Sequence, residues 1–167
     1  DDFVSAFRVG MGELTMGDPL DDTVDLSCMV SEPAAESVES LIDQAVSQGA
    51  EVLVGHEREG ALFHPTLMTR TDSRMAVNRQ ELFAPVVVVE AFDEDRDVLN
   101  QVNDSPYGLQ VGVFTRDIQR MYQSFHGLDV GAVMVNQVSS WRIDHMPYGG
   151  DKRSGNNREG VRYAVEA

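Results

Sequence analysis

The sequence predicts an α/β fold in which a mostly parallel sheet lies between two layers of helices. Segments with helical periodicity alternate with short strand-like runs along most of the chain. The run at residues 86–92 is rich in β-branched residues and apolar on both faces, which is typical of a central parallel strand. Strands joined through helices run parallel and cross over in the right-handed sense. These observations together predict a three-layer α/β/α architecture.

The clearest helix is predicted to begin at residue 32. Ser31 can cap it, and Pro33 stands in its first turn, where the missing N–H costs nothing. Apolar residues then recur at the spacing of one helix face, and Gly49 ends the helix. Further helices are predicted at the start of the chain, at residues 93–103, and after Asp117, which can act as a cap.

Short apolar segments between these helices are predicted to be strands, at residues 50–54, 65–68, 86–92, 109–114 and 130–135. A long polar loop rich in glycine follows at residues 136–160. Ligands of open α/β sheets bind beyond the carboxyl ends of the strands, so this loop is a predicted site region. No linker interrupts the chain, and residues 1–167 are predicted to be one domain or one part of a domain.

The charge of the chain is strongly unbalanced. It has 28 acidic and 13 basic residues, a formal net charge of −15. Such a charge makes nucleic acid and anionic membrane surfaces poor partners. No apolar run approaches the roughly 20 residues that span a bilayer. The single cysteine, Cys28, excludes an internal disulfide, and a cytoplasmic location is expected.

Eight short motifs go further than these patterns. They are GDPLD at 17–21, GAEVLVG at 49–55, PTL at 65–67, ELFAP at 81–85, NDSPYGL at 103–109, VN at 135–136, PYGGDKRSG at 147–155 and REG at 158–160. In this order they resemble the motifs of NAD(P)-dependent aldehyde dehydrogenases. Three departures from the family's pattern lie in loops: Ala84 stands for the usual Gly, Gly55-His56 for Gly-Gly, and Asn156-Asn157 where a Gly is usual.

The resemblance implies that residues 1–167 are the C-terminal portion of an aldehyde dehydrogenase catalytic domain. The family oxidises aldehydes to acids with NAD or NADP through a cysteine thiohemiacetal. Its nucleophilic cysteine and general-base glutamate would lie upstream of these residues, so the chain alone is expected to be inactive. The alternative is a non-catalytic fragment or interaction domain. The amino-acid pattern of the loop at residues 136–160 is similar to that of lactaldehyde, non-phosphorylating glyceraldehyde-3-phosphate and phosphonoacetaldehyde dehydrogenases.

Two residues of the ELFAP motif are the predicted cofactor contacts. In the family's pattern, Glu81 would accept hydrogen bonds from the nicotinamide ribose hydroxyls, a task suited to an ionised carboxylate. Phe83 would pack on the nicotinamide end of the cofactor. Without the family context, Glu81 would be a surface residue beside a core aromatic.

The loop that follows residue 135 carries the predicted substrate contacts. Arg142 is expected to bind an anionic group of the aldehyde through its planar fork, and Trp141 and Tyr148 to supply an aromatic wall. Alternatively, Arg142 forms only a surface ion pair with Asp144. Trp141 and Tyr148 would then simply anchor the loop. Glu159 could relay a proton from the general base, as the resemblance implies, or be a surface acid near a helix start.

The remaining polar residues predict no further chemistry. Cys28 is expected to be a small, semi-buried structural thiol rather than a nucleophile, since no histidine lies near it in sequence. The four histidines lack the spacing of metal ligands, so no metal site is predicted. The expected partners are an aldehyde, which Arg142 suggests is anionic, and further copies of the chain in a homo-oligomer, because a domain of a larger enzyme exposes apolar surface.

Overall fold

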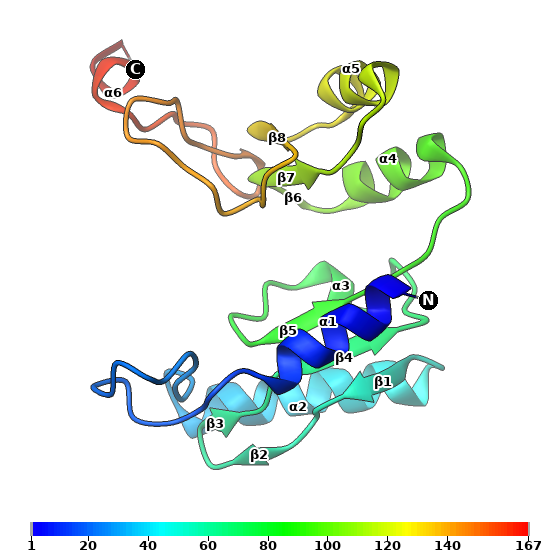
Figure 1. Cartoon of the computed structure of the whole chain (residues 1–167), viewed down its shortest axis with the longest axis vertical. Coiled ribbons are helices and arrows are strands. Elements are labelled where there is room, and N and C mark those ends of the chain that lie inside the picture. The colour runs from blue at the N-terminus through cyan, green and yellow to red at the C-terminus, as the bar shows by residue number, and fades with distance from the viewer. Residues whose placement is uncertain (1, 167) are drawn as a thin grey trace. The chain divides into compact units, whose positions relative to one another are not determined.

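The computed structural model describes residues 2–166, with the side chains of residues 2–165, and confirms a mixed α/β class. The chain divides into two compact units, one up to Ala91 and one from Phe92 (Figure 1). The first holds α1 (Asp2–Gly12), α2 (Glu32–Ser47), β1 (Glu51–Val54), β2 (Arg58–Glu59), β3 (Leu62–Phe63), β4 (Thr66–Thr69), α3 (Ala76–Arg79) and β5 (Val86–Val88). The second holds α4 (Asp95–Asp104), β6 (Tyr107–Gly108), β7 (Gln110–Val113), α5 (Ile118–Gly127), β8 (Ala132–Val135), β9 (Asp151–Lys152) and α6 (Val161–Glu166).

Helix α2 supplies most of the core of the first unit. Its cap is the predicted one, since the hydroxyl of Ser31 accepts a hydrogen bond from the backbone N–H of Ala34, and Gly49 takes a positive φ of 107° just after the helix. The buried residues of its inner face are Ala35, Val38, Ile42 and Ala45, and they pack with Phe63, Met68, Met75 and Val77 from β3, β4 and the segment around α3.

Strand β4, and not β5, is the central strand of the first unit. The sheet has the order β1-β4-β5, and Thr66, Leu67 and Met68 of β4 are fully buried. The prediction that residues 86–92 form a central strand is therefore wrong for the described residues: β5 is shorter, stands at an edge, and leaves Val87 exposed. An apolar run indicates burial but does not indicate which neighbouring strands cover it.

The sheet itself is divided into small pieces. Strands β4 and β5 are parallel, and so are β7 and β8, whereas the pairs β1–β4, β2–β3 and β6–β9 are antiparallel. The prediction of a mostly parallel sheet overlooked the connection from β1 to β4. That connection holds only the β2–β3 hairpin, and a parallel pair needs a longer crossover, usually a helix.

Helices α4 and α5 lie beside the parallel pair β7–β8 in the second unit (Figure 1). The carboxylate of Asp117 caps α5 as predicted, accepting from the N–H groups of Gln119 and Arg120. The side chain of Asn103 at the end of α4 donates to the carbonyl of Gly127 and accepts from the N–H of Asp129. This amide therefore fixes the end of α4 to the end of α5.

An apolar face of α5 is left uncovered. Ile118, Tyr122 and Phe125 recur at helical spacing on this helix, and all three are exposed. Exposed contiguous apolar surface on a folded protein usually marks an interface. The face is therefore available for contact with another polypeptide.

We predict that the chain self-associates, and more strongly at 1 M salt than at 0.1 M. The net charge of −15 opposes contact, and the Debye length falls from about 10 Å to about 3 Å over that range. Analytical ultracentrifugation measures the association. Ile118→Gln with Phe125→Gln should weaken it, whereas the control Gln119→Ser on the same helix should not. A strict monomer at both salt concentrations contradicts this prediction.

Candidate functional site

The residues that the sequence predicts to be functional fall into two groups, one in each compact unit. Glu81 and Phe83 lie in the first unit, between α3 and β5. Arg142, Tyr148 and Glu159 lie in the second, in the long loop that follows β8.

The segment before β5 directs two side chains outward and one inward. Leu82 packs against the core cluster of the first unit, while its neighbours Glu81 and Phe83 are exposed. The turn is closed by a hydrogen bond of 2.8 Å from the N–H of Val86 to the carbonyl of Ala84. Burial of Leu82 therefore fixes the outward direction of both predicted cofactor contacts.

Phe83 combines two unfavourable features. Its side chain is 83% exposed, and its backbone has a φ of 46°. A bulky residue rarely adopts positive φ, and such backbone conformations concentrate at functional sites. An aromatic ring that is held in solvent by an unusual backbone is suited to packing against a flat ligand.

The loop after β8 begins with a second residue of positive φ. Asn136 has a φ of 55°, and its side-chain oxygen accepts a hydrogen bond of 2.9 Å from the N–H of Thr115. Its own N–H donates to the carbonyl of Val113 at 2.8 Å. The end of β8 is thus tied to the end of β7 at the carboxyl edge of the parallel pair, where the loop departs.

Arg142 is held from two sides by the other predicted site residues. Its guanidinium carbon lies 4.2 Å from the centre of the Tyr148 ring, and one terminal nitrogen lies 3.2 Å from a carboxylate oxygen of Glu159. Tyr148 and Glu159 are themselves joined by a pair of backbone hydrogen bonds, of 3.1 and 2.6 Å. The ion partner of Arg142 among the described residues is therefore Glu159, and not the Asp144 considered from sequence.

A cavity of about 360 Å³ lies beside this arginine. Arg142 and Tyr148 contribute to its lining, and Trp141 does not. The full lining is Leu109, Gln110, Ser139, Ser140, Arg142 and Tyr148. A guanidinium, a carboxamide, two hydroxyls and an aromatic ring thus surround a space of the size of a small polar molecule.

The loop is fastened to the rest of its unit by residues that the sequence reasoning did not single out. The ammonium of Lys152 donates to the carbonyls of Asn103 and Ser105, at 2.9 and 3.1 Å. Arg158 donates to the carbonyl of Gly150 and pairs with Asp151. Lys152 is the single lysine of the chain, and this rarity could have marked it in the sequence as a residue with a specific role.

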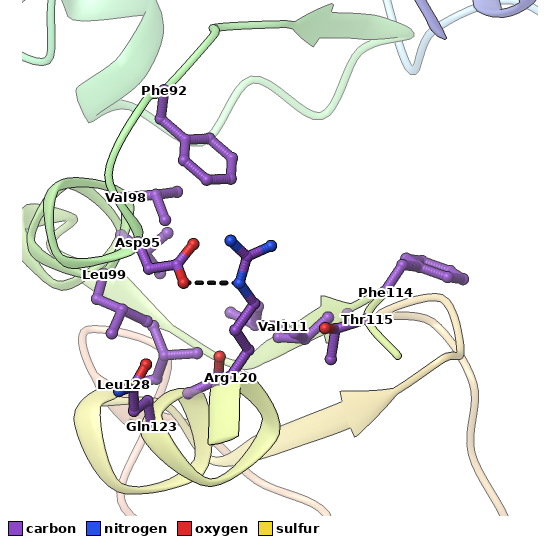
Figure 2. A pocket seen from close by; sticks show the side chains of 14 residues that line it. Phe92, Asp95, Val98, Leu99, Val111, Phe114, Thr115, Arg120, Gln123 and Leu128 are labelled. Atoms are coloured by element: carbon purple, nitrogen blue, oxygen red, sulfur yellow. Dashed lines mark ion pairs between the residues drawn. The ribbon is translucent and has the colours of Figure 1, made fainter. Parts of the chain in front are cut away.

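A second cavity, of about 320 Å³, lies in the same unit between α4, β7 and α5 (Figure 2). Its wall is mainly apolar and includes Phe92, Leu99 and Val111. The side chain of Arg120 lies across it toward Asp95, with which it forms an ion pair of 2.8 Å (Figure 2). The lining contains no cysteine, histidine or lysine, and its one carboxylate, Asp95, is paired with Arg120.

Cys28 is exposed, which corrects the prediction of a semi-buried thiol. Its segment lies between α1 and α2, outside the named helices and strands. Among the described side chains, those of residues 2–165, no three acidic, cysteine or histidine groups gather as metal ligands would. None of the helices in that range is long and apolar enough to cross a membrane.

The whole chain, residues 1–167, matches the aldehyde dehydrogenase family, and it belongs to that family. It is 42% identical over 164 residues to a 3-sulfolactaldehyde dehydrogenase of Priestia aryabhattai, covering 98% of this chain and 34% of the relative. Among solved structures, it resembles aldehyde dehydrogenase 21 of Physcomitrella patens in complex with the reaction product succinate, at 34% identity and a TM-score of 0.96 over 99% of this chain and 34% of that one. It also resembles the glyceraldehyde-3-phosphate dehydrogenase GapN of Methanocaldococcus jannaschii complexed with NADP, at 36% identity and a TM-score of 0.94 over 99% and 36%. The chain thus spans about a third of the length of these proteins.

We predict that Phe83→Gly leaves the stability of the chain unchanged within about 1 kcal/mol. Relief of the left-handed backbone, roughly 1–2 kcal/mol, offsets the greater chain entropy of glycine, roughly 0.5–1 kcal/mol. The matched variant Leu82→Ala should cost about 1–2 kcal/mol, below the usual range for a fully buried leucine. Urea unfolding measures both, and a larger loss for Phe83→Gly than for Leu82→Ala contradicts the outward role of Phe83.

Proposed function

We propose that this chain is the C-terminal portion of an aldehyde dehydrogenase catalytic domain that oxidises a small anionic aldehyde with NAD or NADP. Membership of the family supports the reaction class. The observation that carries the choice of substrate is the cavity beside Arg142, whose guanidinium is oriented by Tyr148 and Glu159. In the complete protein, the edge strand β5 would pair with a further strand, giving the three-layer, mostly parallel sheet of the family.

The reaction needs a nucleophile that Cys28 is poorly placed to supply. In the family's reaction a cysteine thiolate would carry the substrate as a covalent adduct, and water would release it as the acid. The nicotinamide cofactor, which Glu81 and Phe83 would help to hold, would supply the hydride acceptor. We assign the thiolate and the base that activates water to the rest of the protein. This chain contributes contacts that position the aldehyde and the cofactor.

Glu81 and Phe83 are the proposed cofactor contacts. Both side chains point away from the core, and the nicotinamide ribose and ring offer hydroxyl donors and a flat face that suit a carboxylate and an aromatic ring. An exposed aromatic at positive φ has no role in the packing of the first unit, which supports a ligand as its partner. The identity of the cofactor as NAD or NADP does not follow from these two contacts.

Arg142 is the proposed anchor for the anionic end of the aldehyde. Only one of its nitrogens is engaged by Glu159, so the remaining N–H groups of the fork can reach a sulfonate, phosphate or carboxylate. In a protein of charge −15, a local cation would be needed to hold an anionic substrate. Tyr148 forms part of the wall of this pocket, and Trp141 would border it from outside.

Glu159 could have either of two roles in the complete protein. Its salt bridge favours a role in orienting Arg142, and its side chain is 67% exposed. A role as a proton relay rests on the family resemblance and requires a base supplied by the rest of the protein. We further propose a cytoplasmic homo-oligomer, for which the exposed face of α5 offers contact surface.

The 167-residue chain alone is expected to form no NADH or NADPH from aldehydes. It carries one thiol, Cys28, which is exposed and accepts a long hydrogen bond of 3.9 Å from the hydroxyl of Ser27, a group that cannot serve as its base. The absorbance of the reduced cofactor measures the activity of the purified chain. A rate that survives Cys28→Ser would contradict the assignment of the nucleophile to the rest of the protein and would favour a different chemistry. The non-catalytic alternative requires that the complete protein also be inactive.

In the complete protein, Arg142→Ala should lower kcat/KM for an anionic aldehyde by roughly ten- to a hundredfold. A hydrogen bond to a charged group contributes about 1.5–3 kcal/mol, which converts to this range. Propanal, which has no charge, should be oxidised almost as before. The control Arg116→Ala removes an exposed arginine near α5 and should change neither rate. An equal loss on both aldehydes would mean that Arg142 only supports the loop.

A further inference from the structure

The cavity beside Arg142 is bounded by two segments that lie far apart in the sequence. Leu109 and Gln110, where β7 begins, supply one part of the lining, and four residues of the loop, between positions 139 and 148, supply the other. The shape of the cavity therefore depends on how firmly the loop is held to the segment that leads into β7.

The backbone pairing that holds these two segments together is short. Strand β9, in the loop, pairs with β6 through two residues of each strand. The N–H of Gly108 donates to the hydroxyl oxygen of Ser154 at 3.0 Å. The N–H of Arg153 donates to the carbonyl of Pro106, also at 3.0 Å. A small two-stranded pairing is marginally stable in water, so a side chain that adds to it contributes to the position of the loop.

Lys152 extends this pairing to the helices of the second unit. Its Nζ atom donates to the carbonyl oxygens of Asn103 and Ser105, at 2.9 and 3.1 Å. These carbonyls lie at the C-terminal end of α4, where the helix dipole favours a cation. The side chain of Asn103 in turn joins the end of α4 to the end of α5. Lys152 therefore fastens β9 to a junction of two helices as well as to β6.

The backbone of Lys152 indicates that its side chain has a specific task. Its φ is 56°, in the left-handed region that disfavours residues with a Cβ atom and that glycine adopts freely. Such conformations persist where the surroundings stabilise them, and they concentrate near functional sites. Lys152 is also the single lysine among 13 basic residues. A compact ammonium suits two backbone carbonyls, whereas the planar fork of arginine suits carboxylates and phosphates.

We propose that Lys152 is a positioning residue for the substrate: it holds Tyr148 in place, and Tyr148 orients the guanidinium of Arg142. This inference rests on the proposed function and adds a residue that acts on the same site without lining the cavity. Tyr148 precedes β9 by three residues, and the centre of its ring lies 4.2 Å from the guanidinium carbon of Arg142. Without the ammonium, β9 would be held by its short pairing, and Tyr148 and Arg142 would shift together.

The expected effect is on the affinity for the substrate. Arg142 is the proposed contact for the anionic end of the aldehyde, and not for the carbon that reacts. A displaced guanidinium loses binding energy that substrate and transition state share, so KM rises and kcat is nearly unchanged. An aldehyde without an anionic group makes no such contact, so its KM should not respond.

The test uses steady-state kinetics of the complete protein with 3-sulfopropanal and with propanal, which lacks the sulfonate. Lys152→Met removes the ammonium and keeps a long side chain, and Lys152→Gly also relieves the backbone. Both should raise KM for 3-sulfopropanal by roughly three- to tenfold, with kcat and the KM of propanal changed less than about twofold. If the backbone conformation alone mattered, Lys152→Gly would match or improve on the wild type, and that result overturns the proposal.

Two controls separate positioning from a general loosening of the protein. Arg153→Met removes the same charge from the next residue, which is exposed, and should change neither aldehyde's KM. In an Arg142→Ala background, Lys152→Met should cause no further loss, because residues that act through one another are not additive. A further loss in that background, an equal rise of KM for both aldehydes, or no rise in either Lys152 variant overturns the proposal.

A measurement without substrate distinguishes this inference from the proposed function. Trp141 is the single tryptophan of the chain and directly precedes Arg142, so its fluorescence reports on the loop. In the 167-residue chain, Lys152→Met and Lys152→Gly should increase its quenching by acrylamide roughly 1.5-fold or more, since a loosened loop opens more often. Arg153→Met should not. If the complete protein oxidises neither aldehyde but quenching rises as expected, the proposed function fails and Lys152 still positions the loop. Unchanged quenching in both Lys152 variants overturns its role.

Discussion

The loop of residues 136–160 depends on backbone segments that approach one another too closely for a side chain to stand between them. A Cβ atom at Gly131, just before β8, would overlap the carbonyl of Gly149, and one at Gly149 would overlap the carbonyl of Asn157. Three backbone segments are therefore stacked in direct contact. Such a close approach requires glycine, which has no Cβ atom. This contact holds both limbs of the loop against the parallel pair β7–β8, so that Tyr148 and Glu159 meet and Arg142 can lie between them.

The basic residues of this loop occupy two kinds of position. The chain is strongly acidic, yet its single lysine fastens the loop to the carbonyls at the end of α4, where the helix dipole favours a cation. Arg158 is likewise engaged with a carbonyl and with Asp151. Of the basic residues that fasten or line this loop, Arg142 is the one that borders the cavity. Lys152 and Arg158 therefore hold the loop in place, and Arg142 is the cation that the proposed function can use.

Local features of the fold could be predicted from sequence, and pairings between distant segments could not. The caps by Ser31 and Asp117 are confirmed because a cap joins a side chain to the next turn of its own helix. The central position assigned to residues 86–92 was wrong because strand order depends on segments far apart in the chain. In the site, the sequence identified Arg142 as a candidate substrate contact but did not identify its partner. That partner, Glu159, is 17 positions away, and the nearer Asp144 was considered instead. Gln110 also lines the cavity but gave no signal in sequence, since the loop that faces its strand is identified only when the pairing of distant segments is known.

The ion pair of Arg142 with Glu159 is weak, and a weak pair suits the substrate contact proposed for this arginine. A pair between partly exposed groups contributes about 0–1 kcal/mol, and Glu159 is well exposed. An anionic ligand at the remaining N–H groups of the guanidinium would therefore meet little competition from Glu159, while the Tyr148 ring would keep the fork in its plane. Glu159 would also limit the conformations of the arginine before a ligand binds, so that less side-chain entropy would be lost on binding. A buried, saturated salt bridge would hold the arginine more firmly and would leave it no capacity for a ligand.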